Sequence, residues 1–306
     1  MAAGAPKETA APARRALTEA KGLAESLPDL LVEAERVATT VLAGWHGRRR
    51  SGPGETFWQF RTFIPGEAAS GIDWRRSARD EQHLYVRERE WEAAHTIWLW
   101  VDLSVSMNFR SRLAGASKRD RAVVLLLALS DLLAAAGERV GLLGAGAPVL
   151  SRNAAERLAG TLAHLDAPPE IDTHALRRFT DVILFGDFLD PQPELEKKFG
   201  AIARAGSRAH LVEVFDPVEE TFPYTGRTEF RDPETGQRHL VGRAEEYRED
   251  YTGRLTLHRA WIDDYCRRLD WTHLIHRTDK PATAPLLALH ARLADRGDRL
   301  LGGRAA

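Results

Sequence analysis

The segment TIWLWVDLSVSM, residues 96–107, joins a strongly apolar run to three polar side chains at alternating positions. The apolar part predicts a buried β-strand, because a strand that is covered on both faces reads as a continuous hydrophobic stretch. Asp102, Ser104 and Ser106 then fall at the carboxyl end of that strand. In doubly wound sheets, ligands bind beyond the carboxyl ends of the strands. These three residues therefore form the first candidate site.

Strands and helices alternate along the rest of the chain. Strand patterns recur at RVGLLGAG, DVILFGD, RAHLVEVFD and LDWTHLIHRTD, with helical patterns between them. Such alternation predicts a parallel sheet with helices on both faces. We therefore expect an α/β protein with a three-layer, doubly wound, mostly parallel, Rossmann-like sheet over residues 94–298. GRTEFRDPETGQRHLVG predicts an inserted β-hairpin at about 226–242, and a long polar helix follows it.

The N-terminal part has a different sequence pattern. Residues 1–14 are rich in Ala and Pro, which predicts a disordered tail. A helical apolar pattern follows, and then TFWQFRTF and HLYVREREW read as strands around a short helix. We expect residues 15–93 to form an N-terminal helix with a strand-containing extension, and residues 299–306 to form a C-terminal tail.

Composition excludes several classes of protein. The 306 residues are 43% hydrophobic, and 43 basic residues nearly balance 44 acidic ones, so nothing calls for nucleic acid or an anionic membrane. The single cysteine, Cys266, cannot form an internal disulfide or a thiolate zinc site. No apolar run approaches the roughly 20 residues that span a bilayer, and the N-terminus lacks a secretory signal pattern. We expect a soluble, cytoplasmic protein.

Further oxygen-bearing side chains follow at matching positions. Asp187 ends the strand DVILFGD, and Thr173 opens a short helix shortly before it, capped by Asp172 or Thr173 itself. Together with Asp102, Ser104 and Ser106, they offer hydroxyl and carboxylate oxygens from three loops, which suit a hard dication such as Mg²⁺ or Mn²⁺. If hydroxyls are the main ligands, the ion stays positive enough to attract a partner's carboxylate. The alternative is that the serines simply cap the next helix.

These motifs resemble a known family. D-L-S-V-S, a later Thr loop and ILFGDFLD resemble the metal-ion-dependent adhesion site (MIDAS) of von Willebrand factor A domains. FRTFIPGEAASGIDWRRSAR with LYVRERE is similar to the signature of the bacterial domain of unknown function 58 family, and the likeness covers about residues 48–296. The resemblance implies a von Willebrand factor A-like fold, Mg²⁺ at the five positions and partnership with a MoxR-type AAA+ ATPase. It implies a chaperone-like role in assembly or metal insertion.

The sequence departs from the family signature at three places. Glu67 stands where Asp is usual, Ser70 where Arg is expected and Gly186 where Ser is usual before Asp-Phe. The signature segment also holds charged and aromatic residues that either pair on a helix or contact a partner. The candidates for partner binding are Arg61, Asp73, Trp74, Arg75 and Arg79.

Three other motifs give weaker evidence of a functional site. GLLGAGAP has the spacing G-x-x-G-x-G and a proline where a helix should begin, so a tight loop is favoured over a dinucleotide site. His273 and His276 lie three apart on a predicted strand and face opposite sides, which favours core or surface histidines over zinc ligands. Trp98 and Trp100 are expected to pack in the core.

Two functions from different classes remain. The first is a non-enzymatic, metal-dependent interaction module that acts as an adaptor for an AAA+ ATPase and an unidentified client. The second is a Mg²⁺-dependent phosphohydrolase that uses Asp102, although the D-x-D pattern of haloacid-dehalogenase-like enzymes has Ser104 at its second position here. G-x-S-x-G, which a serine hydrolase would need, does not occur in the chain.

Overall fold

A computed structural model describes most of the chain. It divides into two compact units, one of Met1–Gly47 with Thr96–Ala306 and the other of Arg48–His95, and each is considered by itself. The described residues are 10–45, 57–63, 72–80, 83–89, 95–165, 169–178 and 180–302.

A five-stranded parallel sheet forms the centre of the larger unit, in the order β4-β3-β5-β6-β9. This arrangement confirms the expected α/β class. Consecutive side chains of a strand point to opposite faces, and β3 uses both faces for burial, as the unbroken apolar run predicted. The strands are β3 (Thr96–Val101), β4 (Arg139–Leu142), β5 (Asp181–Gly186), β6 (Arg208–Phe215) and β9 (Thr272–Arg277).

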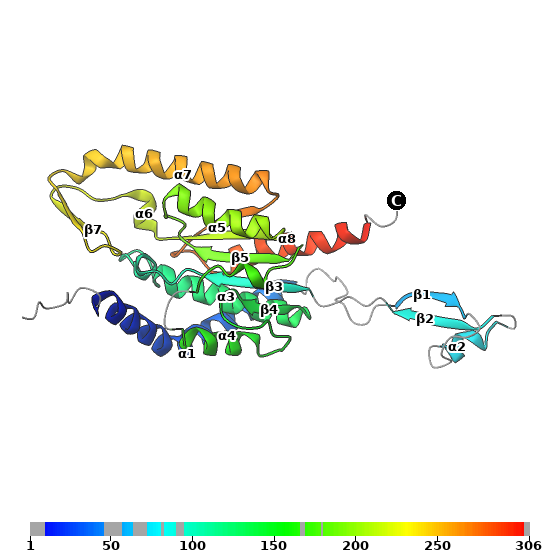
Figure 1. The fold of residues 1–306 in the computed structure, drawn as a ribbon. Coiled ribbons are helices and arrows are strands. Elements are labelled where there is room, and N and C mark those ends of the chain that lie inside the picture. Colours follow the sequence, from blue (N-terminus) through cyan, green and yellow to red (C-terminus); the bar gives the residue numbers. More distant parts are fainter. Residues whose placement is uncertain are drawn as a thin grey trace, which may run out of the picture. The chain divides into compact units, whose positions relative to one another are not determined.

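Helices cover the sheet on both sides. α1, α3 and α4 lie on one side with α8, and α5 and α7 lie on the other (Figure 1). Leu99 and Val101 belong to the first core, whereas Trp98 and Trp100 belong to the second, as expected for these tryptophans. The helices are α1 (Ala10–Trp45), α3 (Lys118–Ala135), α4 (Ala154–Ala163), α5 (Gln192–Arg204), α7 (Arg248–Arg268) and α8 (Thr283–Gly302).

The terminal helices are longer than the sequence pattern indicated. α1 begins at Ala10, inside the segment expected to be a tail, because its Ala-rich start has high helix propensity. Residues 1–9 lie outside the described part. α8 continues to Gly302, into the expected C-terminal tail. α1 also packs on α3, α4 and α8, so it belongs to the larger unit rather than to the signature segment.

Four short elements lie between β6 and α7. α6 (Pro217–Thr221) was not foreseen, and Asp216 and Glu219 form a capping box at its start. β7 (Thr228–Arg231) and β8 (Arg238–Val241) then pair as an antiparallel hairpin. A 3₁₀ turn, η5 (Ala244–Tyr247), leads directly into α7.

The smaller unit is a two-stranded antiparallel sheet with a single helical turn. β1 (Phe57–Thr62) pairs with β2 (Tyr85–Arg89), and α2 (Trp74–Ser77) lies between them in the chain. The Ser77 hydroxyl donates to the Asp73 carbonyl and accepts the Tyr85 N–H, both at 2.8 Å, which ties α2 to β2.

Along the described parts of the chain, no helix has both the length and the apolar character that crossing a membrane requires.

A carboxyl group lies half-buried among the helices of one sheet face. Burial raises the pKa of Asp131 on α3 to about 6, against a hydrogen bond from the Ala155 N–H, and the carboxylates of Glu35 and Glu156 raise it further. The folded protein therefore binds this proton more tightly than the unfolded chain. The group's contribution to stability is present below its ordinary pKa near 3.8 and is lost as the pH rises through about 6.

We predict that Asp131→Asn stabilises the protein at pH 7.5 but not at pH 4, because it removes a charge that burial disfavours. The expected gain in unfolding free energy is about 1 kcal/mol after allowance for solvent screening. Urea unfolding at both pH values measures it. Asp264→Asn on the exposed face of α7 is the control, and an equal gain at both pH values would contradict the assignment.

A core substitution tests the packing of α3. Leu126 is fully buried, whereas Leu257 on α7 is 72% exposed. We predict that Leu126→Ala lowers the unfolding free energy by about 2–5 kcal/mol, because it leaves a cavity. Leu257→Ala should change it by less than about 0.5 kcal/mol. Chemical denaturation measures the unfolding free energy of both variants. Similar losses in the two would contradict the packing described for α3.

Candidate functional site

Two strand ends bring the predicted acidic residues together. Val101 pairs with Phe185, so Asp102 and Gly186 leave their strands side by side, and the Asp102 N–H donates to the Phe185 carbonyl at 2.8 Å. A Cβ on Gly186 would lie 3.2 Å from the Asp102 Cβ. The glycine that departs from the family signature thus leaves room for Asp102 beside the strand that carries Asp187.

The two serines converge, but not in the way the sequence indicated. Ser104 has φ −59° and ψ 162°, whereas Ser106 lies in a 3₁₀ turn, η3 (Val105–Asn108), so the alternating polar positions do not mark one continuous strand. The chain turns because the Met107 side chain is buried in the core. Even so, the two hydroxyl oxygens are 3.0 Å apart, and the Ser104 N–H donates to Asp102 Oδ1 at 2.8 Å.

Asp187 is held by a buried lysine that sequence reasoning missed. Lys118 Nζ lies 2.8 Å from Asp187 Oδ2 and 2.7 Å from Glu219 Oε1, and its side chain is 1% exposed. The Asp187 Oδ1 atom accepts the Leu189 N–H at 3.3 Å. A signal was present: Lys118 is in the first turn of α3, where the helix dipole disfavours a cation unless carboxylates surround it.

Burial and neighbouring charges together shift the pKa values of Asp102 and Lys118 at this edge of the sheet. Burial raises the pKa of Asp102, the Ser104 hydrogen bonds oppose this, and the nearby Asp187 carboxylate raises it further. Burial alone would lower the pKa of Lys118, but Asp187 and Glu219 outweigh it and raise that pKa. Lys118 therefore stays protonated, whereas the ionised form of Asp102 is disfavoured unless a cation approaches.

Thr173 lies in a 3₁₀ turn, η4 (Thr173–Ala175), which Asp172 caps by accepting the His174 N–H at 2.8 Å. The loop ahead of it is tied to β3, because Trp100 Nε1 donates to the Pro169 carbonyl at 2.8 Å. Trp100 is two residues before Asp102, so this hydrogen bond brings the loop close to the candidate site. Among the described residues, Thr173 makes no hydrogen bond to the other four candidates, so its place in the site stays a prediction.

The donor set fits a hard dication. Two neighbouring ligands of an octahedral ion, each held at about 2.0–2.1 Å, are about 2.9 Å apart, close to the 3.0 Å between the Ser104 and Ser106 hydroxyl oxygens. A cation there would also favour the ionised form of Asp102. Asp187 is occupied by Lys118 and would act through water. Within the described residues, no three His, Cys, Asp or Glu side chains form a metal-binding group, so the fit depends on the hydroxyls.

The candidate partner-binding residues lie on the smaller unit. Asp73 is the N-cap of α2 and accepts the Arg76 N–H at 3.0 Å. Trp74 is 62% exposed. Arg75 and Arg79 are also exposed. Arg61 is on β1, and its side chain is outside the described set.

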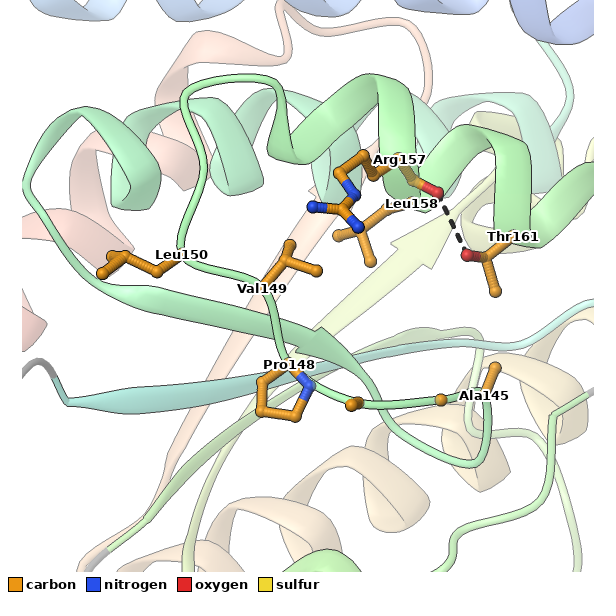
Figure 2. A pocket seen from close by; sticks show the side chains of 9 residues that line it. Ala145, Pro148, Val149, Leu150, Arg157, Leu158 and Thr161 are labelled. Atoms are coloured by element: carbon orange, nitrogen blue, oxygen red, sulfur yellow. Dashed lines mark hydrogen bonds between the residues drawn. The ribbon is translucent and has the colours of Figure 1, made fainter.

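The glycine-rich segment after β4 forms a tight loop. Gly144 and Gly146 have φ values of +81° and +92°, and Val149 then pairs back onto Val140. A Cβ on Gly144 would meet the Glu170 carbonyl oxygen, so the glycine permits a close approach of two loops. An open pocket of about 540 Å³ lies between this loop and α4, with Arg157 beside it (Figure 2). The chain returns to the sheet at Val149 instead of passing directly from the glycines into a helix, as a dinucleotide site would require.

The histidines of β9 are engaged in the core. His273 contacts Glu213 at 2.9 Å and Asp263 at 2.7 Å, whereas burial lowers the pKa of His276 to about 4. The two side chains therefore do not share a site, which agrees with the interpretation drawn from their spacing.

Comparisons with known proteins give a family and distant relatives. The family described as "Protein of unknown function DUF58" matches residues 59–261. Uncharacterized protein Mb1516 of Mycobacterium bovis and uncharacterized protein Rv1480 of Mycobacterium tuberculosis are each 28% identical over 283 residues, covering 87% of this chain and 88% of theirs.

Solved structures give a weaker likeness. The conserved hypothetical protein BatB from Bacteroides thetaiotaomicron has a TM-score of 0.39 at 14% identity. An aerotolerance-related membrane protein from Bacteroides fragilis has a TM-score of 0.39 at 12% identity. In both comparisons the likeness covers 66% of this chain and 100% of the other.

We predict that Lys118→Met lowers the unfolding free energy by about 3–5 kcal/mol, because it leaves the Asp187 and Glu219 carboxylates buried without their cation. Lys198→Met is the matched control. It removes a half-exposed pair with Asp190, which should cost no more than about 1 kcal/mol. Guanidinium unfolding of both variants measures the difference, and equal losses would contradict the role given to Lys118.

Proposed function

We propose that this chain, which belongs to the DUF58 family, is a metal-dependent protein–protein interaction module that binds a partner's acidic side chain. Asp102, Ser104 and Ser106 would hold Mg²⁺ or Mn²⁺, Asp187 would assist through water, and Thr173 would complete the set. The supporting observation is the 3.0 Å separation of the two serine hydroxyls beside the half-buried Asp102 carboxyl.

The charges of the candidate residues would leave a bound cation with most of its positive charge. Neutral serine hydroxyls supply oxygen without cancelling a cation's charge, and Lys118 neutralises Asp187 at 2.8 Å. When bound, the dication supplies an electrophilic centre that attracts an outside carboxylate. The Ser104 N–H fixes the orientation of Asp102 through its Oδ1 atom.

The finer assignment follows the family resemblance. We propose a von Willebrand factor A-like fold with a metal-ion-dependent adhesion site, and a MoxR-type AAA+ ATPase as partner in a chaperone-like process. The parallel order β4-β3-β5-β6-β9 supports the fold assignment, since the site falls at strand ends in the middle of the sheet.

We predict that Asp102→Ala abolishes Mg²⁺-dependent capture of a purified MoxR-type AAA+ ATPase from the same organism, while the variant stays folded. Mg²⁺ at one hundred times its Kd should stabilise the wild type by about 2.7 kcal/mol and the variant by nothing measurable. Pull-down with and without chelator, with thermal unfolding in parallel, gives both results. Asp264→Ala serves as the control.

Capture by Asp102→Ala that persists in chelator would contradict the proposal. The same proteins also test the phosphohydrolase alternative. Mg²⁺-dependent turnover of p-nitrophenyl phosphate by the wild type, lost in Asp102→Asn, would replace the interaction module with an enzyme.

A further inference from the structure

A glutamate from the hairpin reaches the candidate site. Glu234 Oε1 accepts the backbone N–H of Ser106 at 2.9 Å, across 128 residues of sequence. The hairpin, yellow in Figure 1, extends from the side of α7 toward the segment between β3 and α3. An acidic side chain of this chain thus already lies against the residue whose hydroxyl is a candidate ligand.

The tip of the hairpin is shaped to present this carboxylate. The Asp232 Oδ1 atom accepts the Glu234 N–H at 2.9 Å, and the Asp232 carbonyl accepts the Gly236 N–H at 2.9 Å. Gly236 has a φ of +74°, which the tight turn requires. Hydrogen bonds from Thr235 and the Glu234 backbone also lower the pKa of Asp232. The turn therefore holds its own geometry without help from the sheet.

The hairpin is anchored by aromatic contacts on β7 and by a hydrogen bond at its base. Phe222 stacks on Phe230 with ring centroids 5.6 Å apart, and it lies tilted against Tyr251 of α7 at 4.9 Å. The Gly226 N–H donates to Glu245 at 2.7 Å. The strands between base and tip are largely exposed, with a half-buried residue at alternate positions of β7. The hairpin is thus a strap, held by Phe230 and by the Gly226 hydrogen bond and attached near the site by Glu234.

We propose that Glu234 is an internal carboxylate occupant of the docking face, so the strap competes with an acidic partner loop. The proposal rests on the proposed function. A tethered carboxylate reaches an effective concentration in the millimolar range. An outside carboxylate must displace it, and its apparent Kd rises in inverse proportion to the fraction of molecules with the strap open.

Hydrogen exchange at the Ser106 amide tests whether the strap closes in solution. In Glu234→Ala the exchange rate should rise by at least about tenfold, because the N–H loses its acceptor. Glu229→Ala, on the same hairpin, removes only an exposed pair with Arg238 and should leave the rate unchanged. An unchanged rate in Glu234→Ala would overturn the proposal.

Competition is tested with a synthetic peptide of residues 231–238, RDPETGQR. In Mg²⁺ buffer it should bind Glu234→Ala at least about tenfold more tightly than the wild type or Glu229→Ala, as followed by NMR titration. The same peptide with Gln for Glu should not bind. Equal binding to wild type and Glu234→Ala, or binding to neither, would overturn the proposal.

Chelator separates the two proposals. If the peptide still prefers Glu234→Ala in EDTA and Mg²⁺ does not stabilise the wild type, the strap competes for the Ser106 amide alone, and the metal-dependent function fails while the strap stands. If Mg²⁺ stabilises the wild type through Asp102 but the peptide shows no preference, the strap fails and the metal site stands.

Discussion

Two aspartates leave neighbouring parallel strands at one edge of a buried sheet, and the structure must compensate their charge. Lys118 meets Asp187 directly and is enclosed together with Glu219. Asp102 is left beside two hydroxyls, with burial and Asp187 opposing its ionisation. One carboxylate is thus neutralised from within the chain, and the other is available to a cation from outside. The proposed metal site depends on this asymmetry.

Lys118 and Glu219 also take part in hydrogen bonds that connect the surrounding loops. Glu219 accepts from Lys118 and from the Asp216 backbone N–H, while Asp216 accepts the Ser111 N–H at 2.9 Å. The segment after β3, the start of α3 and the turn after β6 are therefore joined by charged hydrogen bonds, which are about twice as strong as neutral ones. Such a frame holds the segment that follows the serines before any ligand arrives. The strap adds a movable carboxylate to this fixed frame.

Sequence reasoning reached the sheet and the strand-end aspartates because both depend on local patterns. The unbroken apolar runs gave β3 and β5, and the residues that follow those strands gave Asp102 and Asp187. Lys118 and Glu234 could not be found in this way, since their contacts span 69 and 128 residues and depend on tertiary placement. The 3₁₀ turn at Ser106 was missed because the burial of Met107, not an alternating pattern, decides the backbone there.

The most direct measurement is a crystal structure of the wild type grown with Mn²⁺, with anomalous difference density calculated around β3. The account predicts a peak within about 2.0–2.3 Å of the Ser104 and Ser106 hydroxyl oxygens, on the side of the Asp102 carboxyl. A crystal saturated with Mn²⁺ that shows no peak among these three side chains would contradict it.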